Sequence, residues 1–278
     1  GAWTLGASQA SDGDVAEILI YRGVLSAAQR QYAENYLINK WFGQSRPMPA
    51  LDFIPDTTPV SLTAAGATLD LNGFDETIGP LSGAPDSNVA LGTGTLTVNS
   101  TTDSTFAGAL SGTGGLVKTG SARLVLDGTS GYTGPTRIQQ GELQVDGSIV
   151  ASSLTTVADG ATLSGIGWVG QLLLEGTLSP GNSPGTINAA DTEWAAGADY
   201  LWEINDIDNG TAGSDPGWDL LAIDGTLDVT ATATPGEQFT IAVTSLDGAV
   251  PGLAAGSLEV GDRFTIATTT DGVLGFDP

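Results

Sequence analysis

The chain has 278 residues, of which 40 are glycine and only 6% are aromatic, so few large side chains are present to fill a thick globular core. Thin layers of Val, Leu, Ile, Ala and Thr suit this composition better, and an apolar fraction of 40% argues against disorder. The formal net charge is −24, and residues 47–278 hold 28 of the 32 acids. Such a surface repels phosphate backbones and anionic membranes, which excludes nucleic acid as a partner.

The chain contains no cysteine and no histidine. A Ser-His-Asp triad, a histidine general base, a thiolate metal site and the usual zinc sites therefore cannot be built from its residues. No run approaches the roughly 18 apolar residues that a membrane-spanning helix needs, so we expect no membrane insertion of this segment. Because the chain starts without methionine and stops in mid-pattern, we expect it to be a piece of a longer protein.

The first part of the chain differs in texture from the rest. The segment VAEILIY (15–21) has the apolar spacing of a buried strand. Ser26 is a helix N-cap residue, and an apolar stripe at three- and four-residue spacing predicts a helix over residues 27–42. Gly43 ends this helix, and the prolines that follow forbid its continuation.

This strand–helix segment resembles the C-terminal end of a concanavalin A-like jelly roll of the laminin-G type. The resemblance implies that residues 1–46 are the remnant of such a domain and that residues 47–60 are a linker. The sugar- and calcium-binding loops of that family would lie upstream of Gly1.

From about residue 58, short strand signals recur every ten or so residues. Six segments share the form small–Thr/Glu–Leu–polar–apolar followed by a turn: 67–73, 94–100, 122–128, 141–147, 161–167 and 225–231. Their alternate apolar residues point to one face: Leu69 and Leu71, Leu96 and Val98, Leu143 and Val145, Leu227 and Val229. Period-2 strands at a short interval predict an all-β solenoid over residues 61–278, with about ten coils and closing coils at about 190–278. A sandwich or barrel of hairpins is the alternative.

Residues 106–149 carry the most specific pattern. Their motif residues are Gly114-Gly115, Lys118-Thr-Gly120, Leu124-Val-Leu126, Tyr132-Thr-Gly134, Thr136, Gly141 and Leu143. In these positions the segment resembles the autotransporter-associated strand repeat of bacteria, with Ala122 and Ser130-Gly131 as departures. The resemblance implies a right-handed parallel β-helix that is exported and displayed at the cell surface.

An acidic segment, EINDIDNGTAGSDPGWD (203–219), is the one candidate metal site. Hard cations such as calcium take carboxylate and carbonyl oxygens from loops of this kind. The candidate ligands are Asp206, Asp208, Asp215 and Asp219. The spacing does not fit an EF-hand, since Gly210 stands where a ligand is needed, and a solvated acidic loop is the alternative.

The four tryptophans in the second half of the β-solenoid region also allow two interpretations. Exposed indole rings form platforms for sugars, whereas buried ones pack under loops and at corners. The candidates are Trp168, Trp194, Trp202 and Trp218, and we expect most of them to pack.

These observations favour a non-enzymatic, secreted or cell-surface structural protein. Its expected partner is another copy of itself, in a fibre or surface layer, with divalent cations as bridges. One alternative is a carbohydrate-binding adhesin module whose partner is a polysaccharide. Another is a polysaccharide-processing β-helix enzyme, although residues 47–278 hold only four bases to neutralise a uronate.

Overall fold

A computed structural model describes residues 27–43 and 54–276, and the chain divides into two compact units, residues 1–53 and 54–278. In the first unit, helix α1 spans Ala27–Phe42, which confirms the predicted helix. Gly43 follows with a φ of +61°, a conformation that favours glycine and ends the helix. The predicted strand at 15–21 and the cap at Ser26 lie outside the described residues.

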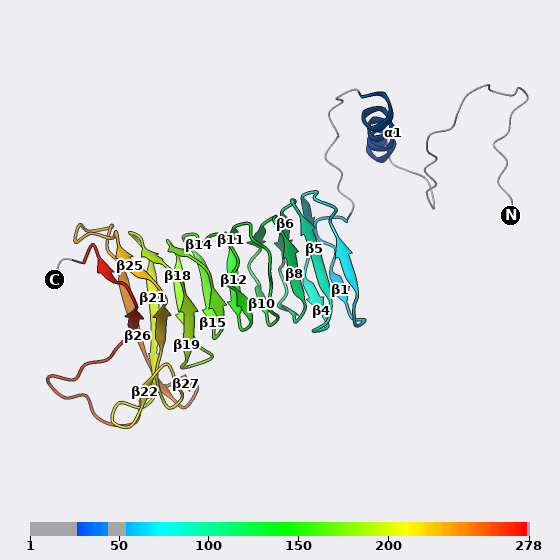
Figure 1. Ribbon diagram of the computed structural model, residues 1–278. Coiled ribbons are helices and arrows are strands. Elements are labelled where there is room, and N and C mark those ends of the chain that lie inside the picture. The colour runs from blue at the N-terminus through cyan, green and yellow to red at the C-terminus, as the bar shows by residue number, and fades with distance from the viewer. Residues whose placement is uncertain (1–26, 44–53, 277–278) are drawn as a thin grey trace, which may run out of the picture. The chain divides into compact units, whose positions relative to one another are not determined.

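The second unit is built from parallel sheets (Figure 1). The largest, called sheet 1, runs in the order β1 (Val60–Leu62), β4 (Leu81–Gly83), β7 (Ser104–Phe106), β10 (Arg123–Leu126), β12 (Gly141–Val145), β15 (Ala161–Gly165), β18 (Thr177–Pro180), β21 (Asp199–Ile204), β23 (Gly217–Trp218) and β22 (Thr211–Ala212). Strand β26 (Thr240–Asp247) also pairs with β21, and β27 (Val250–Pro251) pairs with β26.

Three smaller sheets run alongside sheet 1. Sheet 2 has nine strands: β3 (Glu76–Ile78), β6 (Leu96–Asn99), β9 (Leu116–Thr119), β11 (Thr136–Ile138), β14 (Thr155–Val157), β17 (Leu172–Leu174), β20 (Thr192–Trp194), β25 (Thr226–Val229) and β29 (Gly272–Leu274). Sheet 3 holds β13 (Ser148–Ile149), β16 (Trp168–Val169), β19 (Thr186–Ala189), β24 (Leu220–Ile223) and β28 (Ala267–Thr269). Sheet 4 holds β2 (Thr68–Asp70), β5 (Asn88–Gly92) and β8 (Ala109–Gly112).

The chain visits these sheets in a recurring order. In most cases a strand of sheet 1 is followed by one of sheet 4 or sheet 3 and then by one of sheet 2, and we call each such group a coil. In the coil of β10 the sheet 2 strand β11 follows directly, and β22 and β23 come between β21 and β24. Among the described strands, only the pairs β21–β23 and β26–β27 are antiparallel. This pairing contradicts a hairpin sandwich and is consistent with the predicted solenoid. Sheet 2 has nine strands, which corresponds to nine coils where we expected about ten. The last two coils are longer than the others because they contain long loops.

A ladder of apolar residues runs through the core between the sheets. Leu124 of β10 lies in register with Leu143 of β12, which lies in register with Leu163 of β15. The ladder continues through Leu178 of β18 to Tyr200 of β21, and all five side chains are fully buried. Each coil thus adds one apolar layer in this row, and no thick core is needed, as the composition predicts.

The six segments with the shared sequence form are all strands, but they lie on different faces. They correspond to β2, β6, β10, β12, β15 and β25, which belong to sheets 4, 2, 1, 1, 1 and 2. The alternation was predicted correctly, since Leu96 and Val98 of β6 and Leu143 and Val145 of β12 are buried.

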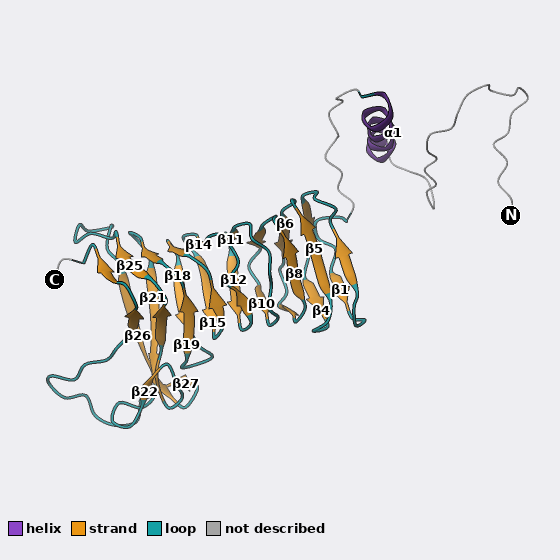
Figure 2. Ribbon diagram, viewed as in Figure 1, coloured by secondary structure: helices purple, strands orange, loops and turns teal. Residues whose placement is uncertain are grey.

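The last coils carry an extension that interrupts the regular pattern. We call residues 205–218 and 248–266 the arm; it extends away from the sheets beside β22 and β27 and is mainly loop (Figure 2). Its two segments are joined by backbone hydrogen bonds from Ile207 N to Ala255 O and from Ala255 N to Asn205 O, both 2.8 Å.

Candidate functional site

Three of the four candidate metal ligands, Asp206, Asp208 and Asp215, lie in the arm. The Asp206 carboxylate accepts hydrogen bonds from the backbone N–H groups of Asp208 and Asn209, at 3.1 and 2.9 Å. The Asp215 carboxylate accepts one from the Asn205 amide at 2.8 Å. The Asp206 carboxylate therefore stabilises a local turn, and the Asp215 carboxylate links two distant positions within the arm.

Asp219 lies apart from them, fully buried at the start of β24. Its two carboxylate oxygens accept hydrogen bonds from Gly185 N at 2.8 Å and from Glu203 N at 2.9 Å. Burial raises the pKa of Asp219 to about 7, although these two N–H donors lower it in part. The sequence pattern placed Asp219 in an acidic loop. In the structure, the buried Asp219 carboxylate instead connects its own segment to Gly185 and Glu203.

Within residues 27–43 and 54–276, no group of three or more acidic side chains lies close enough together to hold a metal ion. The four candidate carboxylates are instead divided between the arm and the core. The calcium site at Asp206, Asp208, Asp215 and Asp219 stays a prediction, because these four carboxylates do not form one cluster within the described residues.

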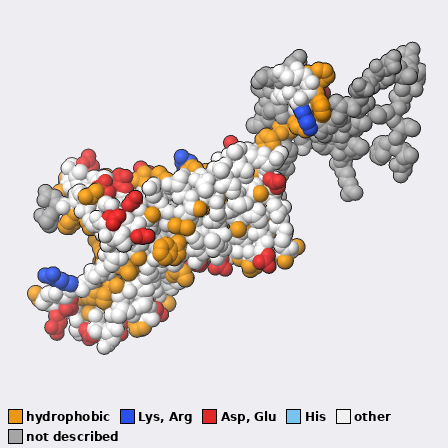
Figure 3. Space-filling view, in the orientation of Figure 1, with side chains coloured by type: hydrophobic (Ala, Val, Ile, Leu, Met, Phe, Trp, Pro, Cys, Tyr) orange, Lys and Arg blue, Asp and Glu red, His pale blue; other side chains and the backbone are white. Residues whose placement is uncertain are grey.

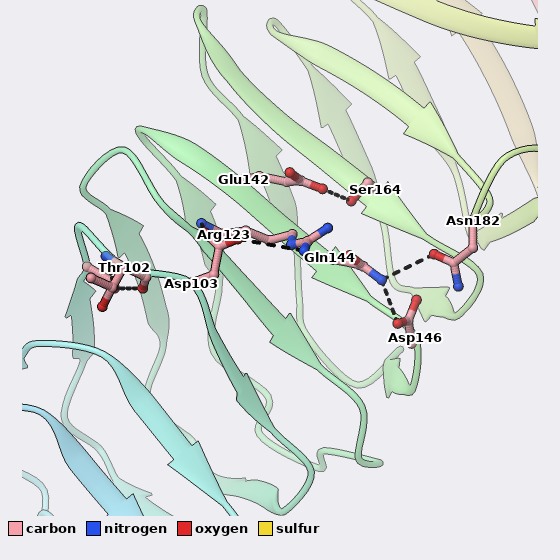
Figure 4. Close-up of polar contacts among 9 residues, drawn as sticks. Thr102, Asp103, Arg123, Glu142, Gln144, Asp146, Ser164 and Asn182 are labelled. Atoms are coloured by element: carbon pink, nitrogen blue, oxygen red, sulfur yellow. Dashed lines mark hydrogen bonds and ion pairs between the residues drawn. The ribbon is translucent and has the colours of Figure 1, made fainter. Parts of the chain in front are cut away.

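The outer face of sheet 1 carries a row of polar side chains (Figure 4). Arg123 of β10 pairs with Asp103 at 3.6 Å, and both are well exposed, so this ion pair contributes little to stability. One coil further on, Ser164 donates a hydrogen bond of 2.5 Å to Glu142. The outward positions thus hold polar groups in contact between successive coils.

The row continues at the corner where sheet 1 meets sheet 3. The Gln144 amide donates to the Asp146 carboxylate at 2.7 Å and to the Asn182 side-chain oxygen at 3.2 Å (Figure 4). Asn182 belongs to the loop that follows β18, whereas Gln144 and Asp146 belong to the coil of β12, so three planar polar groups from two coils gather at this corner. We call Gln144, Asp146 and Asn182 the corner triad.

Lys118, in the most specific sequence motif, is fully buried. Its ammonium group donates to the carbonyl oxygens of Thr119 at 2.8 Å, Gly120 at 2.9 Å and Gln140 at 3.1 Å. Gln140 belongs to the next coil, so the lysine joins two coils. Burial lowers the pKa of Lys118 to about 8, while the charges of Asp103 and Glu142 partly offset this. The role of Lys118 is therefore structural.

Tyr132 of the same motif fills the core of its coil and is fully buried. Its hydroxyl lies 2.5 Å from that of Thr136, which lies 2.9 Å from the hydroxyl of Ser152. Burial raises the pKa of Tyr132 to about 12. Ser130, at one of the two departures from the motif, is buried. Its hydroxyl accepts a hydrogen bond of 3.0 Å from the backbone N–H of Leu110 in the neighbouring coil.

The tryptophans divide as expected, with one exception. Trp194 and Trp202 are buried, and Trp218 is half-buried, donating to Thr265 O at 3.0 Å. Phe264 of the arm packs against Trp202 and Trp218, with ring centroids 5.6 and 5.0 Å apart. These rings attach the arm to the core. Trp168 is different, since 49% of its surface is exposed.

The surface of the protein is strongly acidic, in line with the net charge of −24. Figure 3 shows acidic side chains gathered on this face over the strands nearest the C-terminus, with few basic ones beside them. In the part of the chain that the structure describes, no helix is long and apolar enough to cross a membrane.

The parallel sheets and the repeated coils are consistent with a repeat protein of the β-solenoid type. Comparison with protein families identifies the repeat. Residues 116–145 match the passenger-associated-transport-repeat (PATR) family, inside the predicted repeat at 106–149. Lys118 and Tyr132 lie within this match.

Two named relatives are similar to parts of the chain. An extracellular serine protease of Serratia marcescens is 33% identical over 169 residues, 60% of this chain and 14% of the relative. The adhesin BmaC autotransporter of Brucella suis biovar 1 (strain 1330) is 40% identical over 108 residues, 37% of this chain and 3% of the relative. The chain thus spans only a small part of the length of either relative. Together, these matches support an autotransporter passenger repeat protein.

Proposed function

We propose that the chain is a non-enzymatic part of an exported bacterial protein, located at the cell surface or outside the cell. Residues 54–278 would form a right-handed parallel β-helical stalk that holds attachment surfaces away from the cell. Residues 1–46 would be the end of a laminin-G type domain. The parallel pairing of strands from β1 to β29 is the observation that carries this proposal.

Each coil of the stalk supports its neighbours through backbone hydrogen bonds, so the stalk needs no large core and no disulfide. The outer face of sheet 1 is polar, as in the row of Figure 4, which suits an extended rod in water. The PATR match and the relative named an adhesin support export and attachment.

The relative named a protease raises the question of enzymatic activity. This chain has no histidine, so its own residues cannot supply a Ser-His-Asp triad. The similarity covers 14% of that relative, which leaves most of the relative outside the shared region. A structural role is compatible with partial similarity to both a protease and an adhesin.

Attachment is tested by deleting the gene from the source bacterium and counting cells that stay bound to a surface or to host cells after washing. We expect the deletion strain to bind several-fold less and re-expression to restore binding. Equal attachment of the parent and deletion strains on every surface would contradict the adhesive role.

Self-association is a second part of the proposal. Among the described strands, β1, β2 and β3 at one end and β26, β28 and β29 at the other have no strand beyond them in their sheets, apart from the short pairing of β26 with β27. Such edges pair readily with other strands. The net charge of −24 opposes this contact, so we expect calcium to promote it.

Electron microscopy of the purified chain, with calcium and then with a chelator, tests this part. Ordered assemblies that dissolve on chelation are expected. Single short rods under both conditions would contradict self-association and would leave the attachment role to be judged by the deletion strain.

A further inference from the structure

Trp168 occupies an outward position of β16 on sheet 3. Its register neighbours are Ser148 of β13 and Asn188 of β19, so the indole lies between two small polar side chains of adjacent coils. With 49% of its surface exposed, Trp168 is the most exposed tryptophan within residues 54–276. A flat aromatic ring of this kind on a rigid sheet needs no reorganisation before it can stack on a ligand.

Apolar side chains extend the platform on both sides. Val150 follows β13 and is 53% exposed, and Ile166 precedes β16 and is 47% exposed. Both lie within two residues of the row that holds Trp168, so exposed apolar side chains from two neighbouring coils flank this row.

The corner triad borders this platform. The Asp146 carboxylate accepts a hydrogen bond of 3.4 Å from Ile166 N, two residues from Trp168. Its other oxygen accepts from Gln144, which also reaches Asn182 (Figure 4). Asn182 is exposed, while Gln144 and Asp146 are half-buried and fixed by these bonds.

The two halves of this surface have the chemistry that a sugar ring needs. A pyranose presents C–H groups on its face and hydroxyl groups at its edge. The face stacks on an indole, and the hydroxyls bond to planar side chains at its edge: an amide both donates and accepts hydrogen bonds, and a carboxylate accepts them. A protein partner would instead require a larger buried apolar area than these three exposed side chains provide.

Charge decides which sugars fit. Asp146 is the one charged side chain of the triad and the platform, and the chain as a whole carries −24. An acidic polysaccharide would be repelled, and no Lys or Arg among these residues could offset that repulsion. A neutral glycan meets no such barrier.

We propose that Trp168 and the corner triad form a binding site for neutral pyranose glycans. The inference rests on the proposed attachment role and names the class of ligand for it. Trp168 supplies the stacking surface, and Gln144, Asp146 and Asn182 bind the hydroxyl groups.

Native gel electrophoresis of the full 278-residue chain in gels that contain galactomannan, dextran or starch tests the proposal, with alginate as the acidic comparison. We expect slower migration in at least one neutral gel and none in alginate. Trp168→Ala should weaken the apparent affinity about tenfold, the amount that loss of one aromatic contact removes, while Trp168→Tyr should keep most of it.

The matched control is Trp41→Ala, because Trp41 has nearly the same exposure, 48%, and lies in the first unit. Binding by this variant should equal that of the wild type. The proposal is overturned if no neutral polysaccharide slows the chain or if Trp168→Ala migrates like the wild type. Either result leaves surface location and attachment by the deletion strain unchanged, so failure of this site is distinguishable from failure of the proposed function.

Discussion

Asp219 and Gly185 are 34 residues apart in sequence, and the carboxylate of Asp219 accepts a hydrogen bond of 2.8 Å from the Gly185 backbone N–H. The same carboxylate accepts a second bond from Glu203 N, at the end of β21. Asp219 follows the first arm segment, so this buried group fixes the base of the arm to the preceding coil, through Gly185, and to β21 of its own coil, through Glu203.

Asp219→Ala should therefore destabilise the second unit. The substitution leaves two buried N–H donors unpaired, and we expect the free energy of unfolding to fall by roughly 3 kcal/mol. Urea unfolding followed by circular dichroism measures the change. Asp208→Ala, at an exposed position in the arm, is the control and should change it by less than about 0.5 kcal/mol.

The raised pKa of Asp219 predicts a dependence on pH. Between pH 4 and pH 7 the folded chain holds a proton on Asp219 that the unfolded chain has lost, because burial raises the folded pKa from 3.8 to about 7. The unfolded state binds fewer protons in this window, so this group's contribution to stability is present below pH 4 and is lost as pH rises to 7.

The Asp219→Asn variant isolates that contribution from those of the other acids. As the pH rises from 4 to 7, the unfolding free energy of the wild type should fall relative to that of the variant by an amount on the order of 4 kcal/mol. A constant difference across this range would show that Asp219 is already ionised in the folded chain at pH 4.

Lys118→Met should also destabilise the second unit. Methionine fills similar space, but the carbonyl oxygens of Thr119, Gly120 and Gln140 lose a shared donor, at a cost of roughly 2–3 kcal/mol. Denaturant unfolding provides the measurement. Arg137→Met removes a positive charge from an exposed position and should be nearly neutral; equal losses in the two variants would indicate a charge effect.

Gly114→Ala tests the close approach of neighbouring coils. A Cβ at this position would collide with the carbonyl oxygen of Gly94, so we expect a loss of at least about 2 kcal/mol or failure to fold. Gly131 lies in the same repeat with open space around it, and Gly131→Ala should change stability by less than about 0.5 kcal/mol. Comparable melting temperatures for both variants would contradict the register of these coils.

Much of this architecture could be predicted from the sequence, because it depends on local patterns. The alternation of Leu143 and Val145 identified a strand with one buried face, and the stripe over residues 27–42 identified the helix. The face to which each strand belongs could not be predicted, since strands such as β6 and β12 share a sequence form and differ only in their place within the coil.

The site residues were harder to predict because long-range contacts decide them. Asp219 looked like a loop carboxylate, and only the pairing of β21 and β24 with their neighbours buries it. Trp168 stood among four tryptophans with similar local surroundings, and its exposure follows from its outward register on sheet 3. The burial of Lys118 could have been predicted only from its position in the repeat motif.

The central claim, an exported stalk at the cell surface, is tested most directly by immunogold electron microscopy of intact cells of the source bacterium. Antibodies raised against the purified chain should label the surface of unbroken cells, and treatment of those cells with proteinase K should remove the label. Gold found only inside sectioned cells, with intact cells unlabelled and the protein resistant to external protease, would contradict the account.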